Sequence, residues 1–230
     1  MFFEILGFTR GLFIIFIFII NYFHIIIFFK SMKKNTLLLL FFFIFYNSYS
    51  QKFDLGIKSG SNFATQNIKS IKGTKSITGL HLGIFTYIKL PLVFGIQPEI
   101  QYSMQGTKID ANTIRNIDYI NVPLLVRTTF GKLNIHFGPQ FGILTNAINE
   151  VSGIPTDIKD KLLERDFSLV FGASVEPIDR FVFSMRYVKG LKNISDNDPF
   201  SNETKNTVFQ FSFGYVLIRL GGNKNSDNKK

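Results

Sequence analysis

The residues best suited to catalysis are two histidines, His81 and His136, and the serines Ser103, Ser168 and Ser174. A serine hydrolase needs a nucleophile, a base that takes its proton and a third group that orients the base. The chain contains no G-x-S-x-G element to hold such a serine. The histidines and serines alternate with apolar residues. If these segments are strands of a membrane protein, as argued below, their side chains point away from the lipid and so away from its acyl chains. A lipid-modifying enzyme is therefore the least favoured of the three functions that the sequence suggests.

Metal and cofactor sites have equally little support in the sequence. The chain has no cysteine, which excludes disulfides and thiolate ligands. The two histidines fall in different predicted strands without a carboxylate pair nearby, so they do not form a ligand set. The segment Ile154–Asp166 mixes acidic with basic side chains and is typical of a solvated loop rather than a calcium loop. No glycine-rich phosphate motif precedes a helix. We expect neither a metal nor a cofactor.

The charge balance is strongly basic, with 26 Lys and Arg against 16 Asp and Glu and a formal net charge of +10. These charges are scattered, apart from a loosely basic tail at residues 221–230 that includes Lys224, Lys229 and Lys230. A basic total indicates nucleic acid or anionic lipid when it is concentrated on one surface. The scatter instead predicts a solvated, mixed-sign surface and no nucleic-acid partner.

A secretory signal peptide is predicted at residues 32–50. Met32-Lys33-Lys34 forms a basic start, and Thr36–Tyr46 is an apolar stretch whose length suits a signal but is short for a membrane span. Small residues before Gln51 fit cleavage between Ser50 and Gln51. The mature chain would then begin at Gln51.

The segment before this signal differs from it in composition. Residues 1–31 consist largely of Phe and Ile and have no amphipathic pattern. We hypothesise that translation starts at Met32 and that residues 1–31 are an upstream extension read as protein. The alternative is an inner-membrane anchor, because the apolar run Gly11–Phe29 is long enough to span a bilayer.

From Gln51 onward the apolar residues repeat with a period of two, which predicts strands rather than helices. In Phe94–Lys108 one face carries Ile96, Pro98, Ile100, Tyr102 and Met104, and the other face is wholly polar. Seven more segments follow the same pattern to different degrees, so that the predicted strands are Phe53–Ser61, Thr78–Lys89, Phe94–Lys108, Asp118–Phe130, Lys132–Thr145, Asp166–Glu176, Arg180–Leu191 and Thr207–Leu217.

Strand and loop lengths together indicate a membrane barrel. Most of these segments are longer than the about 5–6 residues typical of soluble strands and match the about 9–11 needed to cross a bilayer at a tilt. The connections alternate between long and short, as in outer-membrane barrels with short periplasmic turns and longer external loops. We therefore predict an eight-stranded antiparallel transmembrane β-barrel at residues 51–220, located in the outer membrane, with both mature termini periplasmic.

The polar faces of the strands would line the lumen of this barrel. Charges enclosed there are costly unless they are paired. We expect Glu99 to pair with Arg127 or Arg186 in a structural network that plugs the barrel, with a proton or ion path as the alternative. The expected members of this network are Glu99, Gln101, Arg127, His136, Glu176 and Arg186.

Two smaller expectations concern the wall of the barrel. Prolines within strands remove a ladder hydrogen bond, so Pro98, Pro123 and Pro139 are interpreted as bulge sites. Aromatic residues near strand ends are expected to form interfacial girdles; these are Tyr87, Phe94, Tyr119, Phe130 and Tyr187.

Four segments in this order resemble the PorT-like outer-membrane β-barrel family of Gram-negative bacteria: Leu55–Asn62 (LGIKSGSN), Ile96–Lys108 (IQPEIQYSMQGTK), Tyr119–Arg127 (YINVPLLVR) and Phe137–Ile143 (FGPQFGI). The resemblance covers roughly Phe53–Leu217. It implies a porin-like or transport-associated barrel without an enzymatic site, in a family whose namesake is associated with protein secretion across the outer membrane.

These observations lead to one functional expectation and one alternative. We expect a non-enzymatic outer-membrane protein with a structural role or a role in envelope transport and secretion. The alternative is an adhesin or ligand-binding barrel that uses its long external loops, Asn62–Ile77 and Asn146–Arg165. The expected partners are outer-membrane lipid, the barrel-assembly machinery during insertion, and an unidentified secretion or envelope protein.

Overall fold

The computed structural model describes residues 52–69, 71, 73–90, 93–195 and 203–221. The predicted signal peptide, the segment before it and the basic tail beyond Gly221 lie outside the described residues. Within the described part the chain is almost entirely strand, and no helix there is long and apolar enough to cross a bilayer.

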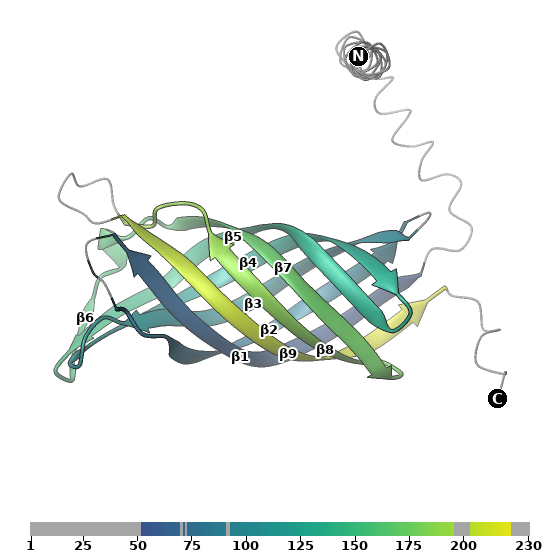
Figure 1. Cartoon of the computed structure of the whole chain (residues 1–230), viewed down its shortest axis with the longest axis horizontal. Coiled ribbons are helices and arrows are strands. Elements are labelled where there is room, and N and C mark those ends of the chain that lie inside the picture. Colours follow the sequence, from purple (N-terminus) through teal and green to yellow (C-terminus); the bar gives the residue numbers. More distant parts are fainter. Residues whose placement is uncertain (1–51, 70, 72, 91–92, 196–202, 222–230) are drawn as a thin grey trace, which may run out of the picture. The chain divides into compact units, whose positions relative to one another are not determined.

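The strands close into a barrel (Figure 1). Eight of the described strands form the ring: β1 (Phe53–Ile68), β2 (Ile77–Lys89), β3 (Phe94–Lys108), β4 (Thr113–Phe130), β5 (Leu133–Val151), β7 (Arg165–Ile178), β8 (Phe181–Gly190) and β9 (Thr204–Leu220). Every neighbouring pair is antiparallel, and β1 pairs with β9 to close the ring. The predicted eight-stranded barrel is confirmed.

The two ends of the barrel differ in their connections. One end holds the connections from β2 to β3, β4 to β5 and β7 to β8, together with the start of β1 and the end of β9. We call it the turn end. The other end, the loop end, holds the connections from β1 to β2, β3 to β4, β5 to β7 and β8 to β9, of which the structure describes residues 69, 71, 73–76, 109–112, 152–164, 191–195 and 203. The connection between β3 and β4, at residues 109–112, is shorter than the sequence predicted, because β4 begins at Thr113 rather than at Asp118.

Several strands also extend further at the loop end than the sequence predicted. β5 continues to Val151 and turns into β6 (Ile154–Asp157), which pairs only with β5, and η1 (Lys159–Lys161) follows. At the usual rise and tilt, β5 spans about 45 Å along the barrel axis, against an apolar band of about 25 Å. The β4–β5–β6 sheet therefore projects beyond the membrane, where no lipid requires an apolar face and the sequence signal is weak.

Pro98, Pro123 and Pro139 do not mark bulges, which corrects the sequence interpretation; a different strand proline, Pro177, lies within one of the register shifts. The pairing between β3 and β4 skips two positions near Pro123 and then resumes in the same register. The pairing between β4 and β5 also skips two positions, near Pro139, and resumes in the same register. Missing hydrogen bonds are tolerated because the neighbouring pairs hold the strand in place. The register shifts lie elsewhere, at Leu55/Gly56, Asp118/Tyr119 and Val175/Ile178.

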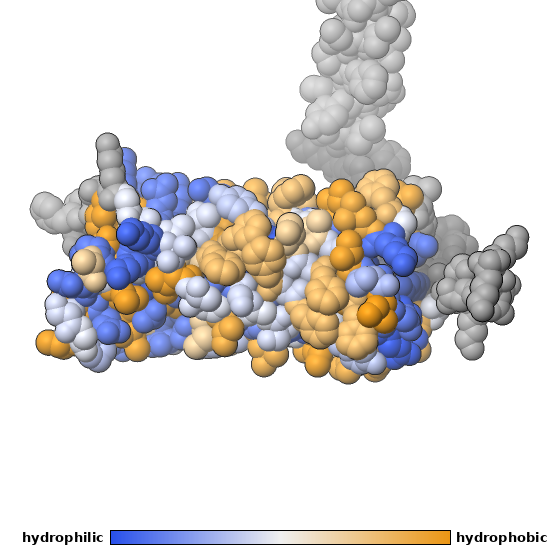
Figure 2. Space-filling view, turned by 60° about the horizontal axis from the view of Figure 1, so that its bottom comes forward, coloured by the Kyte–Doolittle hydropathy of each residue, from blue (hydrophilic) through white to orange (hydrophobic). Residues whose placement is uncertain are grey.

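The outside of the barrel is apolar around its circumference. Ile84, Ile100, Leu124, Phe137 and Phe171 are among many large apolar side chains exposed there. Figure 2 shows apolar residues over the middle of the barrel and towards the turn end, and a mostly hydrophilic surface at the loop end. The expected girdle is only partly correct, since Tyr87 and Tyr119 are buried in the lumen whereas Phe94, Phe130 and Tyr187 are exposed.

Candidate functional site

The lumen is filled with polar side chains. Alternation along each strand turns one side chain in two inward, and the inward set in this chain is mostly polar. Every strand of the ring contributes a buried polar residue; one from each, in chain order, is Lys58, His81, Glu99, Asn121, His136, Ser168, Arg186 and Gln210.

The middle of the lumen holds a cluster of charges centred on Glu99. Arg186 binds both carboxylate oxygens of Glu99 through its two terminal nitrogens, each at 2.7 Å, and Lys58 donates to the same carboxylate. Gln97 donates to Oε1 of Glu99 at 2.7 Å, and Nε of Arg186 donates to Nε2 of His136 at 2.9 Å. The cluster therefore ties β1, β3, β5 and β8 together across the lumen. We call these five residues the Glu99 cluster.

Glycines make this cluster possible. In register, Gly172 of β7 lies between His136 and Arg186, and a Cβ on Gly172 would fall 2.6 Å from Nε2 of His136. Lys58 is likewise flanked by Gly83 and Gly214 on its two neighbouring strands. The missing side chains leave room for the long ones to cross the lumen.

The Glu99 cluster leaves almost no open space. The cavity beside Lys58, Gln97 and Arg186 has a volume of about 20 Å³, and a single water needs roughly 10–15 Å³ by the same kind of measure. The charges of Glu99, Lys58 and Arg186 are paired, as burial requires. The side chains of this layer therefore leave room beside them for about one water molecule.

An apolar layer lies at the loop end. It consists of Ile117, Tyr119, Leu144, Ala147, Ile158, Leu162 and Ile194. Backbone hydrogen bonds fasten the loops over it: Ile158 donates to Ala147 at 3.0 Å, and Leu163 donates to Ile194 at 2.8 Å. The connection after β5 and the one after β8 thus fold inward and contribute to closing the loop end.

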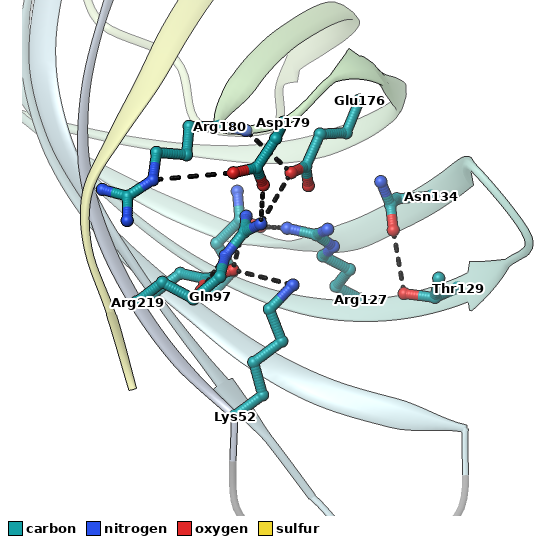
Figure 3. Close-up of polar contacts among 10 residues, drawn as sticks. Lys52, Gln97, Arg127, Thr129, Asn134, Glu176, Asp179, Arg180 and Arg219 are labelled. Carbon is teal, nitrogen blue, oxygen red and sulfur yellow. Dashed lines mark hydrogen bonds and ion pairs between the residues drawn. The ribbon is translucent and has the colours of Figure 1, made fainter. Parts of the chain in front are cut away.

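A second group of charges surrounds Arg219 at the turn end (Figure 3). Nε of Arg219 donates to Asp54 at 3.0 Å, and one terminal nitrogen lies 2.7 Å from Asp179 and 2.9 Å from Glu176. Asp54 and Arg219 are opposite each other in the β1–β9 pairing. This group links the two strands that close the ring to the turn between β7 and β8.

The structure brings together four of the six residues that the sequence singled out. Glu99, His136 and Arg186 meet in the Glu99 cluster, and Arg127 adjoins it by donating to Gln97 at 3.1 Å while stacking on Tyr87. Gln101 is buried without a hydrogen-bond partner for either amide atom among the described residues. Glu176 lies in the group around Arg219.

Sequence reasoning missed Lys58 and Arg219. Lys58 follows Asp54 and Gly56 at alternate positions of β1, and this alternation would have placed it on the inward face. Arg219 lies beyond Leu217, where the last strand was predicted to end, although β9 continues to Leu220.

The possible catalytic groups lie in the same lumen. Nε2 of His81 is 2.7 Å from Oγ of Ser212, but Nδ1 of His81 has no partner among the described residues. A nucleophile–base pair is oriented by a third group, and both side chains are buried inside the barrel, away from lipid. Among the described residues no three His, Asp or Glu side chains are grouped so as to hold a metal ion.

A family model and one of two similar solved structures agree with the fold. The family of the outer membrane protein beta-barrel domain matches residues 45–196. Neisserial surface protein A, from Neisseria, is similar in structure with a TM-score of 0.52 and 8% identity, over 70% of this chain and 96% of that one. Ail, the attachment invasion locus protein of Yersinia pestis, covers 73% of this chain and 99% of its own at 15% identity and a TM-score of 0.45. No curated protein matches.

Proposed function

Because this chain belongs to the outer membrane protein beta-barrel domain family and is an outer-membrane β-barrel, we propose that it is a closed, non-enzymatic barrel with a structural or secretion-associated role in the envelope. It acts as an anchored component rather than as a conduit. The Glu99 cluster is the observation that carries this proposal, since it spans the lumen and leaves a cavity of only about 20 Å³.

The proposal includes the processing of the chain. Residues 32–50 act as a signal peptide that is cleaved between Ser50 and Gln51, and residues 1–31 are not part of the protein that the cell translates. The mature domain at residues 51–220 is inserted by the barrel-assembly machinery. The PorT-like resemblance supports a secretion partner, which would contact parts of the barrel that lie outside the membrane.

Single-channel recording tests the closed lumen directly. The purified mature protein is added to planar lipid bilayers, with a water-filled porin as the positive control. We expect no stable conductance steps, because the Glu99 cluster and the apolar layer close the lumen in series. Steady steps of the size given by the porin would overturn the proposal.

A second function, binding at the cell surface, is favoured by the projecting β4–β5–β6 sheet. All four residues of β6 are exposed, and Ile154 is exposed at 69%. Replacing residues 152–157 by a short Gly-Ser turn separates the two functions, because this change spares Ile158 and Leu162 of the apolar layer. Loss of surface binding with normal secretion and envelope integrity favours the second function, and the reverse favours the first.

The enzyme remains the least supported function. The buried pair His81–Ser212 lacks a third group among the described residues and faces the lumen. The variant His81→Ala is expected to leave the lipid composition of the outer membrane unchanged, as measured by mass spectrometry.

A further inference from the structure

The turn end of the barrel contains a cavity that the closed lumen does not account for. It has a volume of about 530 Å³ and is lined by side chains of β2, β4, β5 and β7, by Lys52 and by the turn that contains Gly131 and Lys132. A volume of this size is typical of small-molecule sites, which measure roughly 300–1,000 Å³. Arg127 lines this cavity and also donates to Gln97 of the Glu99 cluster, so that the cluster adjoins the inner side of the cavity.

The lining of this cavity carries an excess of positive charge. Four cations and one carboxylate line it: Lys52, Lys89, Arg127 and Lys132, and Glu176. We call the four cations the basic mouth. Glu176 is already bound by Arg219 at 2.9 Å and by the backbone N–H of Arg180 at 3.0 Å. It therefore contributes little compensation to the basic mouth.

Arg127 is the central residue of the basic mouth. It is only 6% exposed, and no carboxylate among the described residues lies within 4.0 Å of its guanidinium. One terminal nitrogen donates to the amide oxygen of Gln97, the guanidinium carbon lies 4.2 Å from the ring centre of Tyr87, and Nε has no hydrogen-bond partner among the described residues. A buried cation with an unused donor is costly unless something else pairs with it.

Two of the three surrounding lysines are also free to bind an anion. Lys89 and Lys132 form no ion pair among the described residues. Lys52 lies 3.3 Å from Asp54, which also accepts from Arg219. Figure 3 shows the side chains of Lys52 and Arg127 extending towards the same part of the turn end.

We propose that the basic mouth is a binding site for a small anion with two or more phosphate or carboxylate groups, which enters from the periplasmic side. A guanidinium presents paired donors that match carboxylate and phosphate oxygens, while lysines act as mobile point charges around it. Tyr87 and Gln97 hold Arg127 in position before the anion arrives. This site does not depend on whether the barrel has a structural role or a role in secretion.

Calorimetric titration of the full mature barrel in a zwitterionic detergent tests the proposal, with pyrophosphate and citrate as probes and sucrose as the neutral control. We expect saturable binding of both anions and none of sucrose. Arg127→Gln is expected to weaken binding by at least about tenfold, because it removes a charge-assisted hydrogen bond. Arg115→Gln is the matched control, since it removes an arginine from the same strand at the loop end.

Two further measurements keep the proposal falsifiable. If Arg127→Gln does not fold, the double variant Lys89→Gln/Lys132→Gln replaces it; the two lysines are exposed, and binding should again weaken at least about tenfold. Phosphatidylglycerol is then added to the detergent. Displacement of pyrophosphate identifies a lipid headgroup as the natural source of the anion, and no displacement identifies a soluble one. Absence of saturable binding, or equal losses for Arg127→Gln and Arg115→Gln, overturns the site.

Discussion

The middle of the lumen and the turn end use the same residue types for opposite results. In the Glu99 cluster one carboxylate holds Arg186 and Lys58, and the space left beside it is about 20 Å³. At the turn end Arg127 has no carboxylate partner among the described residues, and the adjoining cavity has a volume of about 530 Å³. A buried charge in the first region stabilises the barrel by being paired, whereas in the second region the charge is left for a ligand.

This difference predicts a gradient in the effect of mutations. Loss of the carboxylate at the centre of the Glu99 cluster should lower the free energy of unfolding most, because it leaves two buried cations without compensation. Changes at the turn end should affect stability less as exposure to water rises, and they should affect anion binding more.

The largest loss of stability is expected for Glu99→Gln. This variant keeps the shape of the side chain but leaves Lys58 and Arg186 without their shared carboxylate. Breaking a buried ion pair in this way costs about 3–5 kcal/mol. The free energy of unfolding is measured by urea titration of the refolded barrel, and the boiled and unboiled gel mobilities show the folded fraction.

Two controls accompany Glu99→Gln. Glu203→Gln removes an exposed carboxylate that pairs with Lys205, and it should leave the free energy of unfolding nearly unchanged. The double variant Glu99→Gln/Lys58→Met should recover part of the loss, because it removes one of the orphaned charges. Equal losses for Glu99→Gln and Glu203→Gln would contradict the central place of Glu99 in the lumen.

Gly172→Ala is expected to be the next most damaging change. A Cβ at this position would lie 2.6 Å from both Nε2 of His136 and the backbone oxygen of Met185. Overpacking of this kind typically costs about 1–3 kcal/mol. Gly214→Ala is the matched control, since its Cβ meets no atom closer than 3.3 Å. Urea titration gives the free energy of unfolding of both variants. A loss of stability in Gly214→Ala as large as that in Gly172→Ala would refute the steric argument.

Arg219→Gln should have a smaller effect. Arg219 contacts Asp54, Glu176 and Asp179, but its side chain is 20% exposed, so that water screens these pairs. We expect a loss of about 1 kcal/mol that shrinks as salt is added. Arg180→Gln, at a more exposed neighbouring position, should lower the free energy of unfolding by less. A loss that does not change with salt would show that Arg219 acts through packing rather than charge.

The sequence predicted the barrel well because its strongest signals are periodic. A lipid-facing strand must alternate, and β3 does so over most of its length. Outside the membrane this requirement ends, and so the extensions of β1, β5 and β9 and the short strand β6 were not predicted. The three register shifts were missed for a different reason, since an extra residue breaks the alternation at one point only, as in the three consecutive buried residues Ile117–Tyr119 at the Asp118/Tyr119 shift, and a single break does not stand out in the sequence.

The candidate site was harder to predict, because it depends on which strands are level with one another. Arg127 and Arg186 both lie on inward faces, and the alternation within a strand cannot distinguish them. Register decides: Arg127 is paired with Gly95, four residues before Glu99 on β3, whereas Arg186 crosses the lumen to the carboxylate itself. Such pairing between distant segments is set by the closure of the whole barrel.

Lys132→Gln is expected to have the smallest effect on stability and therefore separates the two regions most clearly. Lys132 lies in the turn after β4, is exposed and forms no ion pair among the described residues. Its replacement should change the free energy of unfolding by less than about 0.5 kcal/mol, while pyrophosphate binding weakens in calorimetric titration. A structural role for the basic mouth predicts the opposite, since the barrel would then lose stability and the affinity for pyrophosphate would stay the same. The pair of measurements on this one variant thus decides whether the charges at the turn end serve a ligand or the fold.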